Sequence, residues 1–94
     1  MTTSIAVDSV VRRDESLLTQ ELDGEVLIAH LESGNFYSLG ASAKRIWDLI
    51  DFPRSVQEIC QALLQDYAVD STTCERDVLA FLATLVEKGV IRLA

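Results

Sequence analysis

Basic residues are scarce in this chain of 94 residues, which has 8 Lys and Arg against 15 Asp and Glu and a net charge of −7. Binding to the phosphates of DNA or RNA requires clustered Lys and Arg, so we expect no nucleic-acid partner. The acidic balance suits either a solvated surface or a basic partner. No apolar run reaches the roughly 20 residues of a membrane span, and residues 1–15 lack the pattern of a signal peptide. We expect a cytoplasmic protein with no membrane partner.

Residues that hold metals or carry out catalysis are also few, with one His and two Cys in the whole chain. Cys60 and Cys74 form no CxxC motif, so we interpret them as small buried apolar residues in a reducing compartment. His30 has no Cys or His at ligand spacing, so no metal site is expected. No Ser-His-Asp set, acid–base carboxylate pair or phosphate-binding glycine loop is indicated. The sequence therefore predicts a protein that is not an enzyme and needs no cofactor.

The residues that are present predict an antiparallel meander in the first half of the chain. Its three strands are expected at SLLTQEL (16–22), EVLIAHLE (25–32) and NFYSL (35–39). Asp23-Gly24 is a strong signal for a tight hairpin between the first two strands, and residues 33–35 make the second turn. Residues 1–10 carry no clear period and are expected to form a flexible arm before a single domain of residues 11–94.

After Gly40 the apolar residues recur with the period of a helix. The first helix has an apolar face of Ala43, Ile46, Trp47 and Ile50, and it ends before Pro53 because the residue preceding a proline avoids the helical conformation. A capping box, Ser55-x-x-Glu58, starts the second helix. The apolar face of that helix comprises Val56, Ile59, Cys60, Leu63, Leu64 and Tyr67.

A third helix is predicted from a second capping box, Thr72-x-x-Glu75, to a C-terminal cap at Gly89, and residues 90–93 form a short extended end. Its apolar positions cover an arc of roughly 160° at 100° per residue. That arc holds one stripe of Leu79, Leu82 and Val86 and a second stripe of Cys74, Val78, Phe81 and Leu85. Two interpretations stay open: both stripes belong to the core of a central helix, or the second stripe borders a groove.

With so little catalytic chemistry, a binding module is the best interpretation, and the third strand is the candidate receiver. An edge strand presents backbone N–H and C=O groups to which a guest peptide can add itself as the next strand. Phe36 and Tyr37 lie on this strand, and the second stripe of the third helix would supply an apolar wall. Because side chains alternate along a strand, these two aromatic residues cannot share a face.

Over Val11 to Val90 the order and spacing of these features resemble the PqqD-like proteins, also called RiPP recognition elements. The resemblance rests on DGEVLIAHLESGNFYSLGASAKRIWDLI, SVQEICQALLQDY and CERDVLAFLATLVEKGV. The Tyr67-x-Val69-Asp70 segment before the third helix is most similar to stand-alone members that serve lasso-peptide leader peptidases. This chain has Gly40 where many members have Asn, which affects the turn into the first helix.

The resemblance implies an α+β, winged helix-turn-helix fold in which a three-stranded antiparallel sheet is followed by three helices. It also implies a non-catalytic module that binds the leader segment of a ribosomally synthesised precursor peptide by strand addition and delivers it to a modifying enzyme of the leader-peptidase type. Carried over residue by residue, the peptide-binding residues are Asn35, Phe36, Tyr37, Ser38, Leu39, Cys74, Asp77, Val78, Phe81 and Leu85.

Besides a small structural subunit of some larger complex, which the sequence does not exclude, two alternatives remain at this point. One is a PqqD-type chaperone that presents a peptide to a radical enzyme in pyrroloquinoline quinone synthesis. The other is a DNA-binding winged-helix protein, since that fold is shared. Against DNA binding, the third helix carries Glu75, Asp77 and Glu87 beside Arg76 and Lys88, which is a poor surface for phosphates.

Overall fold

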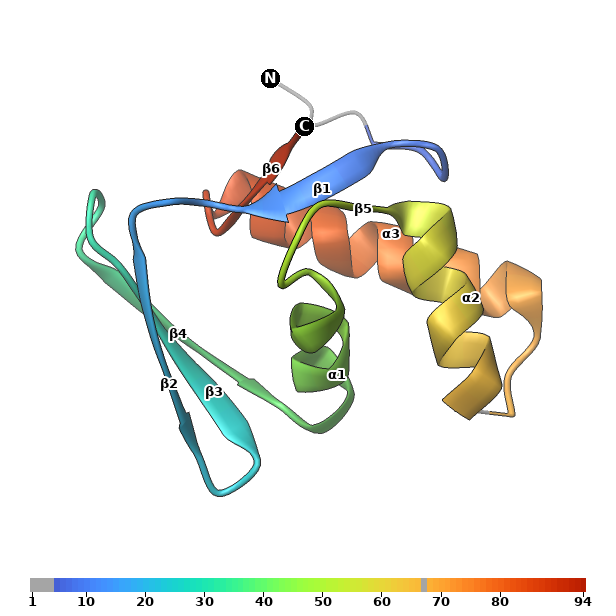
Figure 1. Ribbon diagram of the computed structural model, residues 1–94, viewed down its shortest axis with the longest axis horizontal. Helices are drawn as coiled ribbons and strands as arrows, with labels where there is room; N and C mark the ends of the chain where they lie inside the picture. Colours follow the sequence, from blue (N-terminus) through green and yellow to red (C-terminus); the bar gives the residue numbers. More distant parts are fainter. Residues whose placement is uncertain (1–4, 67) are drawn as a thin grey trace.

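The structure is a computed structural model that describes residues 5–66 and 68–94, and it confirms an α+β protein with a three-stranded antiparallel sheet and three helices (Figure 1). In chain order the elements are β1 (Val10–Arg13), β2 (Leu17–Leu22), β3 (Glu25–His30), β4 (Asn35–Gly40), α1 (Ala41–Leu49), β5 (Arg54–Ser55), α2 (Val56–Asp66), α3 (Ser71–Glu87) and β6 (Ile91–Leu93). Within the described ranges, none of the helices is long and apolar enough to cross a membrane.

The predicted meander is the sheet β2-β3-β4, in which β3 is central and antiparallel to both neighbours. Asp23 and Gly24 both have positive φ angles, 54° and 80°, as a two-residue hairpin turn of the primed type requires. The register places Ile28 opposite Tyr37 and Val26 opposite Leu39. Alternation then gives the sheet an inner face with these side chains toward the helices and an outer face toward solvent.

The turn from β4 into α1, which the sequence pattern associates with Gly40, is made at the next residue. Gly40 is extended, with φ −119° and ψ 165°, and the positive φ of 45° falls on Ala41. The left-handed region is sterically unfavourable for a residue with a Cβ atom. This turn therefore stores local backbone strain at the junction between the sheet and the first helix.

Of the two predicted capping boxes, the one at α2 is confirmed. The Ser55 side chain accepts from the Glu58 N–H and the Glu58 carboxylate accepts from the Ser55 N–H. The box predicted at Thr72 and Glu75 is wrong, because α3 begins with Asp70 as its N-cap, whose carboxylate accepts from the Thr73 N–H at 2.7 Å. A charged acceptor at the positive end of the helix satisfies the orphan N–H better than a hydroxyl does.

The C-terminal end of α3 forms the glycine cap that the sequence predicts. Gly89 has φ +76°, its N–H donates to the Val86 carbonyl, and the Val90 N–H donates to the Leu85 carbonyl. This is the pair of hydrogen bonds of a Schellman motif, which turns the chain sharply back. The turn directs residues after Gly89 into β6.

A second three-stranded sheet, with the order β5-β1-β6, was not predicted. Each of its strands has only two to four residues, too few to show alternation, and their pairing joins distant parts of the chain. Within the expected arm, the carbonyls of Val7 and Ser9 accept from the first N–H groups of α2. The division into an arm of residues 1–10 and a domain of residues 11–94 stays a prediction, and residues 1–4 lie outside the described part, as does Tyr67.

The core lies where α1, α2 and α3 meet the inner face of β2-β3-β4 and the strand β1. Its buried residues are Val11, Val26, Ile28, Leu39, Ile46, Trp47, Ile50, Val56, Ile59, Cys60, Leu63, Cys74, Val78, Leu82, Leu85, Val90 and Ile91. Arg13 covers the buried Trp47, with its guanidinium carbon 4.2 Å from the ring centroid and a hydrogen bond to the Trp47 carbonyl. This core fixes the position of β4 relative to the helices.

Candidate functional site

The strand β4 forms one edge of its sheet. Among the described strands it pairs only with β3, so alternate N–H and C=O groups on its other side are directed away from the ladder. Leu39 is buried and Tyr37 is half-buried on the inner face, whereas Phe36 and Ser38 are exposed on the outer face. The inner residues anchor the strand while its edge stays open to another strand.

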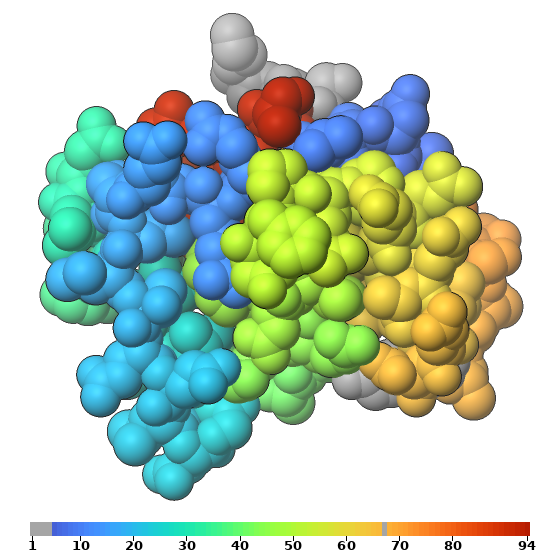
Figure 2. All heavy atoms as spheres, in the orientation of Figure 1, coloured from blue at the N-terminus to red at the C-terminus, as the bar shows by residue number. Residues whose placement is uncertain are grey.

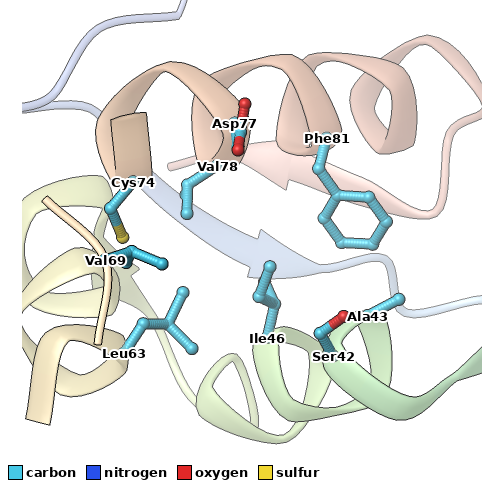
Figure 3. A pocket seen from close by; sticks show the side chains of 9 residues that line it. All are labelled: Ser42, Ala43, Ile46, Leu63, Val69, Cys74, Asp77, Val78 and Phe81. Atoms are coloured by element: carbon cyan, nitrogen blue, oxygen red, sulfur yellow. The ribbon is translucent and has the colours of Figure 1, made fainter. Parts of the chain in front are cut away.

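A groove of about 470 Å³ lies beside this region, between α1, α2 and α3 (Figure 3). It is lined by Ser42, Ala43, Ile46, Leu63, Val69, Cys74, Asp77, Val78 and Phe81. Phe81 and Val78 point from α3 toward Ile46 of α1, and Leu63 and Val69 close one end (Figure 3). The lining is mostly apolar, so the groove suits apolar side chains of a guest rather than a charged ligand.

The second stripe of α3 builds the upper wall of this groove. Cys74, Val78 and Phe81 are spaced by four and three residues, which places them on one side of the helix. Cys74 and Val78 are buried and Phe81 is half-buried, while Leu82 of the first stripe is fully buried in the core. The two open interpretations of α3 are therefore both partly right: each stripe contributes to the core, and the second also borders a groove.

The predicted binding residues fall into two groups in the structure. Cys74, Asp77, Val78 and Phe81 line the groove together, whereas Leu85 is 3% exposed and belongs to the core. The β4 residues Asn35, Phe36, Tyr37, Ser38 and Leu39 do not line it. Tyr37 connects the two groups, because the Lys88 ammonium at the end of α3 lies 5.2 Å from its ring centroid. That all ten residues bind a peptide stays a prediction.

The sequence prediction missed the opposite wall of the groove. Ser42, Ala43 and Ile46 from α1 and Leu63 from α2 contribute to it, as does Val69 from the connection before α3. Ala43, Ile46 and Leu63 were assigned to apolar helix faces, so the signal was present. The sequence could not show that the apolar faces of α1, α2 and α3 leave a groove between them when the helices pack.

Among the described residues, Asp77 is the one charged residue that lines the groove, and Lys88 lies beyond the groove at the end of α3. Asp77 is exposed at the rim and pairs with Arg76 at 3.5 Å. Lys88, the C-cap of α3, lies about three helical turns beyond Asp77, over Tyr37. A guest in this groove would therefore meet a carboxylate near the start of α3, and it would meet an ammonium only beyond the groove, at the end of α3.

Both cysteines are buried thiols, as predicted, and the Cys74 Sγ lies 4.0 Å from the Cys60 carbonyl oxygen. Burial and the neighbouring Cys74 raise the pKa of the Cys60 thiol to about 11. The thiolate, which is the nucleophile, is therefore scarce at neutral pH. Cys74 contributes apolar surface to the groove wall.

The structure gathers a polar cluster of Asp14, His30 and Glu32 that the sequence did not indicate, on the side of β1 and β6 away from the groove. Asp14 is buried, and its carboxylate accepts from Ser16 and from the Arg92 guanidinium and lies 3.4 Å from the His30 Nε2. The Ser16 and Arg92 hydrogen bonds hold the pKa of Asp14 well below its usual range. Because these protein donors already occupy the carboxylate, the cluster is better suited to joining β1, β3 and β6 than to holding an ion.

The comparisons with known proteins agree with this geometry. The family described as coenzyme PQQ synthesis protein D (PqqD) matches residues 25–91. A solved complex of TbiB1 with the TbiA(beta) leader peptide is 32% identical, with a TM-score of 0.82 over 86% of this chain and 94% of that one. A lasso peptide synthetase B1 complexed with the leader peptide is 24% identical, with a TM-score of 0.78 over 87% of this chain and 96% of that one, which supports the fold. No curated protein sequence matches significantly.

Proposed function

Because the chain belongs to the PqqD family, we propose that it binds the leader segment of a ribosomally synthesised precursor peptide. The observation that carries this proposal is the likeness, at 32% identity and over most of both chains, to TbiB1, which was solved with a leader peptide. The open edge of β4 and the apolar groove beside it are the features such a ligand needs. Backbone pairing would supply register, and apolar anchors in the groove would supply much of the affinity.

In this proposal the guest adds to β4 and its side chains reach the groove walls. Each backbone hydrogen bond contributes a net of only about 0.5–1.5 kcal/mol. The half-buried Phe81 therefore carries a large part of the binding energy by burying apolar side chains of the leader, while the buried Val78 and Ile46 shape the wall that these side chains contact. The proposal includes the winged helix-turn-helix description of the fold, with α2 and α3 as the helix pair and the β2-β3 hairpin as the wing.

We further propose that the module is non-catalytic and cytoplasmic and delivers the bound precursor to a leader peptidase, as in lasso-peptide synthesis. The PqqD description of the family favours a second candidate, in which the recipient is a radical enzyme of pyrroloquinoline quinone synthesis. The two candidates share the groove and differ only in peptide and enzyme. A short precursor reading frame beside a peptidase gene, or beside a radical-enzyme gene, distinguishes them.

The direct test is calorimetric titration of the chain with a synthetic leader peptide from the neighbouring precursor gene. We expect saturable one-to-one binding that a scrambled peptide of the same composition does not show. Fluorescence titration with duplex DNA at low salt is the matched control, and there no binding is expected. Tight DNA binding without leader binding would overturn the proposal.

A further inference from the structure

The outer face of the sheet β2-β3-β4 carries large apolar side chains that the fold itself does not use. We define this outer face by its residues: Leu18, Gln20, Leu22, Glu25, Leu27, Ala29, Phe36 and Ser38. Leu18 is 62% exposed, Leu27 is 41% exposed and Phe36 is 81% exposed. A strand face turned to water is ordinarily polar, so this pattern requires an explanation.

The apolar side chains are contiguous rather than scattered. Leu18 is opposite Ala29, Ala29 is opposite Phe36, and Leu27 is opposite Gln20 in the neighbouring row. Together they line a hollow that crosses all three strands. This hollow is separate from the groove between the helices, because it lies on the other side of the sheet.

The charges around the outer face indicate what kind of surface it fits. No Lys or Arg occurs between Asp14 and Ala43, whereas Glu25 lies on the outer face and Asp23 lies in the turn between β2 and β3. Neither carboxylate has a cationic partner among the described residues, while Glu21 points to the inner face and pairs with Lys44 at 2.8 Å. The apolar hollow is thus bordered by carboxylates at its hairpin end, and none of its lining residues is basic. A second copy of this chain would bring the same carboxylates face to face, which opposes self-association.

We propose that the outer face docks a protein partner whose contact surface has an apolar centre bordered by Lys and Arg. The inference rests on the proposed function, under which this partner is the enzyme that acts on the bound precursor. The outer face extends across β4, and the unpaired edge of β4 is the proposed peptide site. The groove lies on the opposite, helix-covered side of the sheet. One molecule can therefore hold the peptide and the enzyme at the same time, with the cleavable part of the precursor kept near the enzyme.

The test uses the double variant Leu18→Thr with Leu27→Thr, which keeps strand-forming residues and changes only exposed positions on β2 and β3. Phe36 is left in place because it lies on the proposed receiving strand. The matched control is Phe52→Ser beyond α1. The exposed Phe52 ring has the Arg54 guanidinium carbon 4.5 Å from its centroid, so the folding of this variant is checked first by circular dichroism. The probe is the purified peptide-modifying enzyme encoded beside the precursor gene, and its affinity is measured by biolayer interferometry without any leader peptide present.

We expect the double variant to bind the enzyme at least about tenfold more weakly, as for the loss of central apolar anchors, while Phe52→Ser binds normally. Wild-type association should weaken as salt is added, because carboxylates at the rim act through screened attraction. Leader affinity of the double variant should stay unchanged in calorimetry. If the wild-type chain does not bind the leader, the proposed function is contradicted instead. Failure of the docking proposal and failure of the proposed function are therefore distinguishable.

Three results would overturn the docking proposal. The first is an enzyme that binds the double variant as well as it binds wild type. The second is an enzyme that does not bind wild type at all. The third is sedimentation equilibrium that shows a wild-type dimer lost in the double variant, which would assign the outer face to a second copy.

Discussion

Lys88 at the end of α3 and Tyr37 on β4 form a cation–π contact across the space between strand and helix, with 5.2 Å from the ammonium nitrogen to the ring centroid. The two residues are far apart in the sequence, and each belongs to one wall of the proposed peptide site. Their contact joins β4 to the C-terminal end of α3, whereas Phe81 lines the groove with Ser42 and Ala43, which follow Gly40 closely. A guest strand on β4 would therefore meet its apolar anchors toward the Gly40 end.

Phe81→Ala should weaken leader binding by about tenfold or more, as for truncation of an aromatic anchor in an apolar groove. Calorimetric titration after a check of folding by circular dichroism is the measurement. Phe81 is a sharper probe than Leu85, since Leu85 is buried and its truncation would cost about 2–5 kcal/mol of stability.

The control for Phe81 is Gln61→Ala, an exposed position of α2. Arg13, although outside the groove, is unsuitable because its guanidinium packs on Trp47. If folded Phe81→Ala binds like wild type while Gln61→Ala does not, the groove has been placed wrongly.

Asp77→Asn should weaken the binding of a basic leader more at low salt than at high salt. Asp77 is exposed at the groove rim, and attraction between exposed charges is screened by ions over about 10 Å at 0.1 M salt. Titrations at two salt concentrations measure the effect, with the exposed Glu87→Gln at the far end of α3 as the comparison. An equal loss at both salt concentrations would show that Asp77 acts by shape or hydrogen bonding.

Asp14→Asn should lower the free energy of unfolding by about 1–3 kcal/mol at neutral pH, because it weakens buried hydrogen bonds to Ser16 and Arg92. The pKa of Asp14 is lowered in the folded state, so its contribution is present above the ordinary Asp pKa of about 3.9 and declines as pH falls below it. The difference between wild type and variant in urea unfolding should therefore shrink in acid. A difference that grows in acid would contradict this sign.

Two backbone substitutions at positive φ angles should differ in their effect on stability. Gly89→Ala should lower it by about 1–2 kcal/mol, since a Cβ atom is unfavourable at φ +76°. Ala41→Gly should raise it or leave it unchanged, because the strain at φ 45° is relieved at the cost of about 0.5–1 kcal/mol of glycine entropy. Thermal unfolding measures both. Gly40→Ala serves as a comparison without backbone strain, because Gly40 has a negative φ, although its Cβ would lie 3.3 Å from the Glu25 Oε1.

The parts of the fold that could be predicted from the sequence are those specified by neighbouring residues. The Asp23-Gly24 turn, the Ser55 and Glu58 capping box and the Gly89 cap depend on contacts within a few positions, and the structure has all of them. The α3 N-cap was assigned two residues late because a Thr-x-x-Glu pattern lay beside the stronger acceptor Asp70.

What could not be predicted depends on pairing between distant residues. The sheet β5-β1-β6 joins Val11 to Arg54 and to Leu93, and no local period marks strands this short. The same holds for the site: α3 showed an apolar wall, but the opposing wall of α1 becomes visible only when the helices are packed. Asp14 and Arg92, 78 positions apart, show no relationship in the sequence.

The pairing of β1 with β6 places the first and last strands of the domain side by side, and the Ala94 N–H donates to the Val10 carbonyl (Figure 1). The β2-β3 hairpin, in contrast, projects from the far side of the body (Figure 2). A domain whose two ends leave at one place can be inserted into a surface loop of a larger protein through two short linkers without stretching its core. Covalent attachment to an enzyme through these two ends would therefore leave the β4 edge and the groove accessible to a peptide.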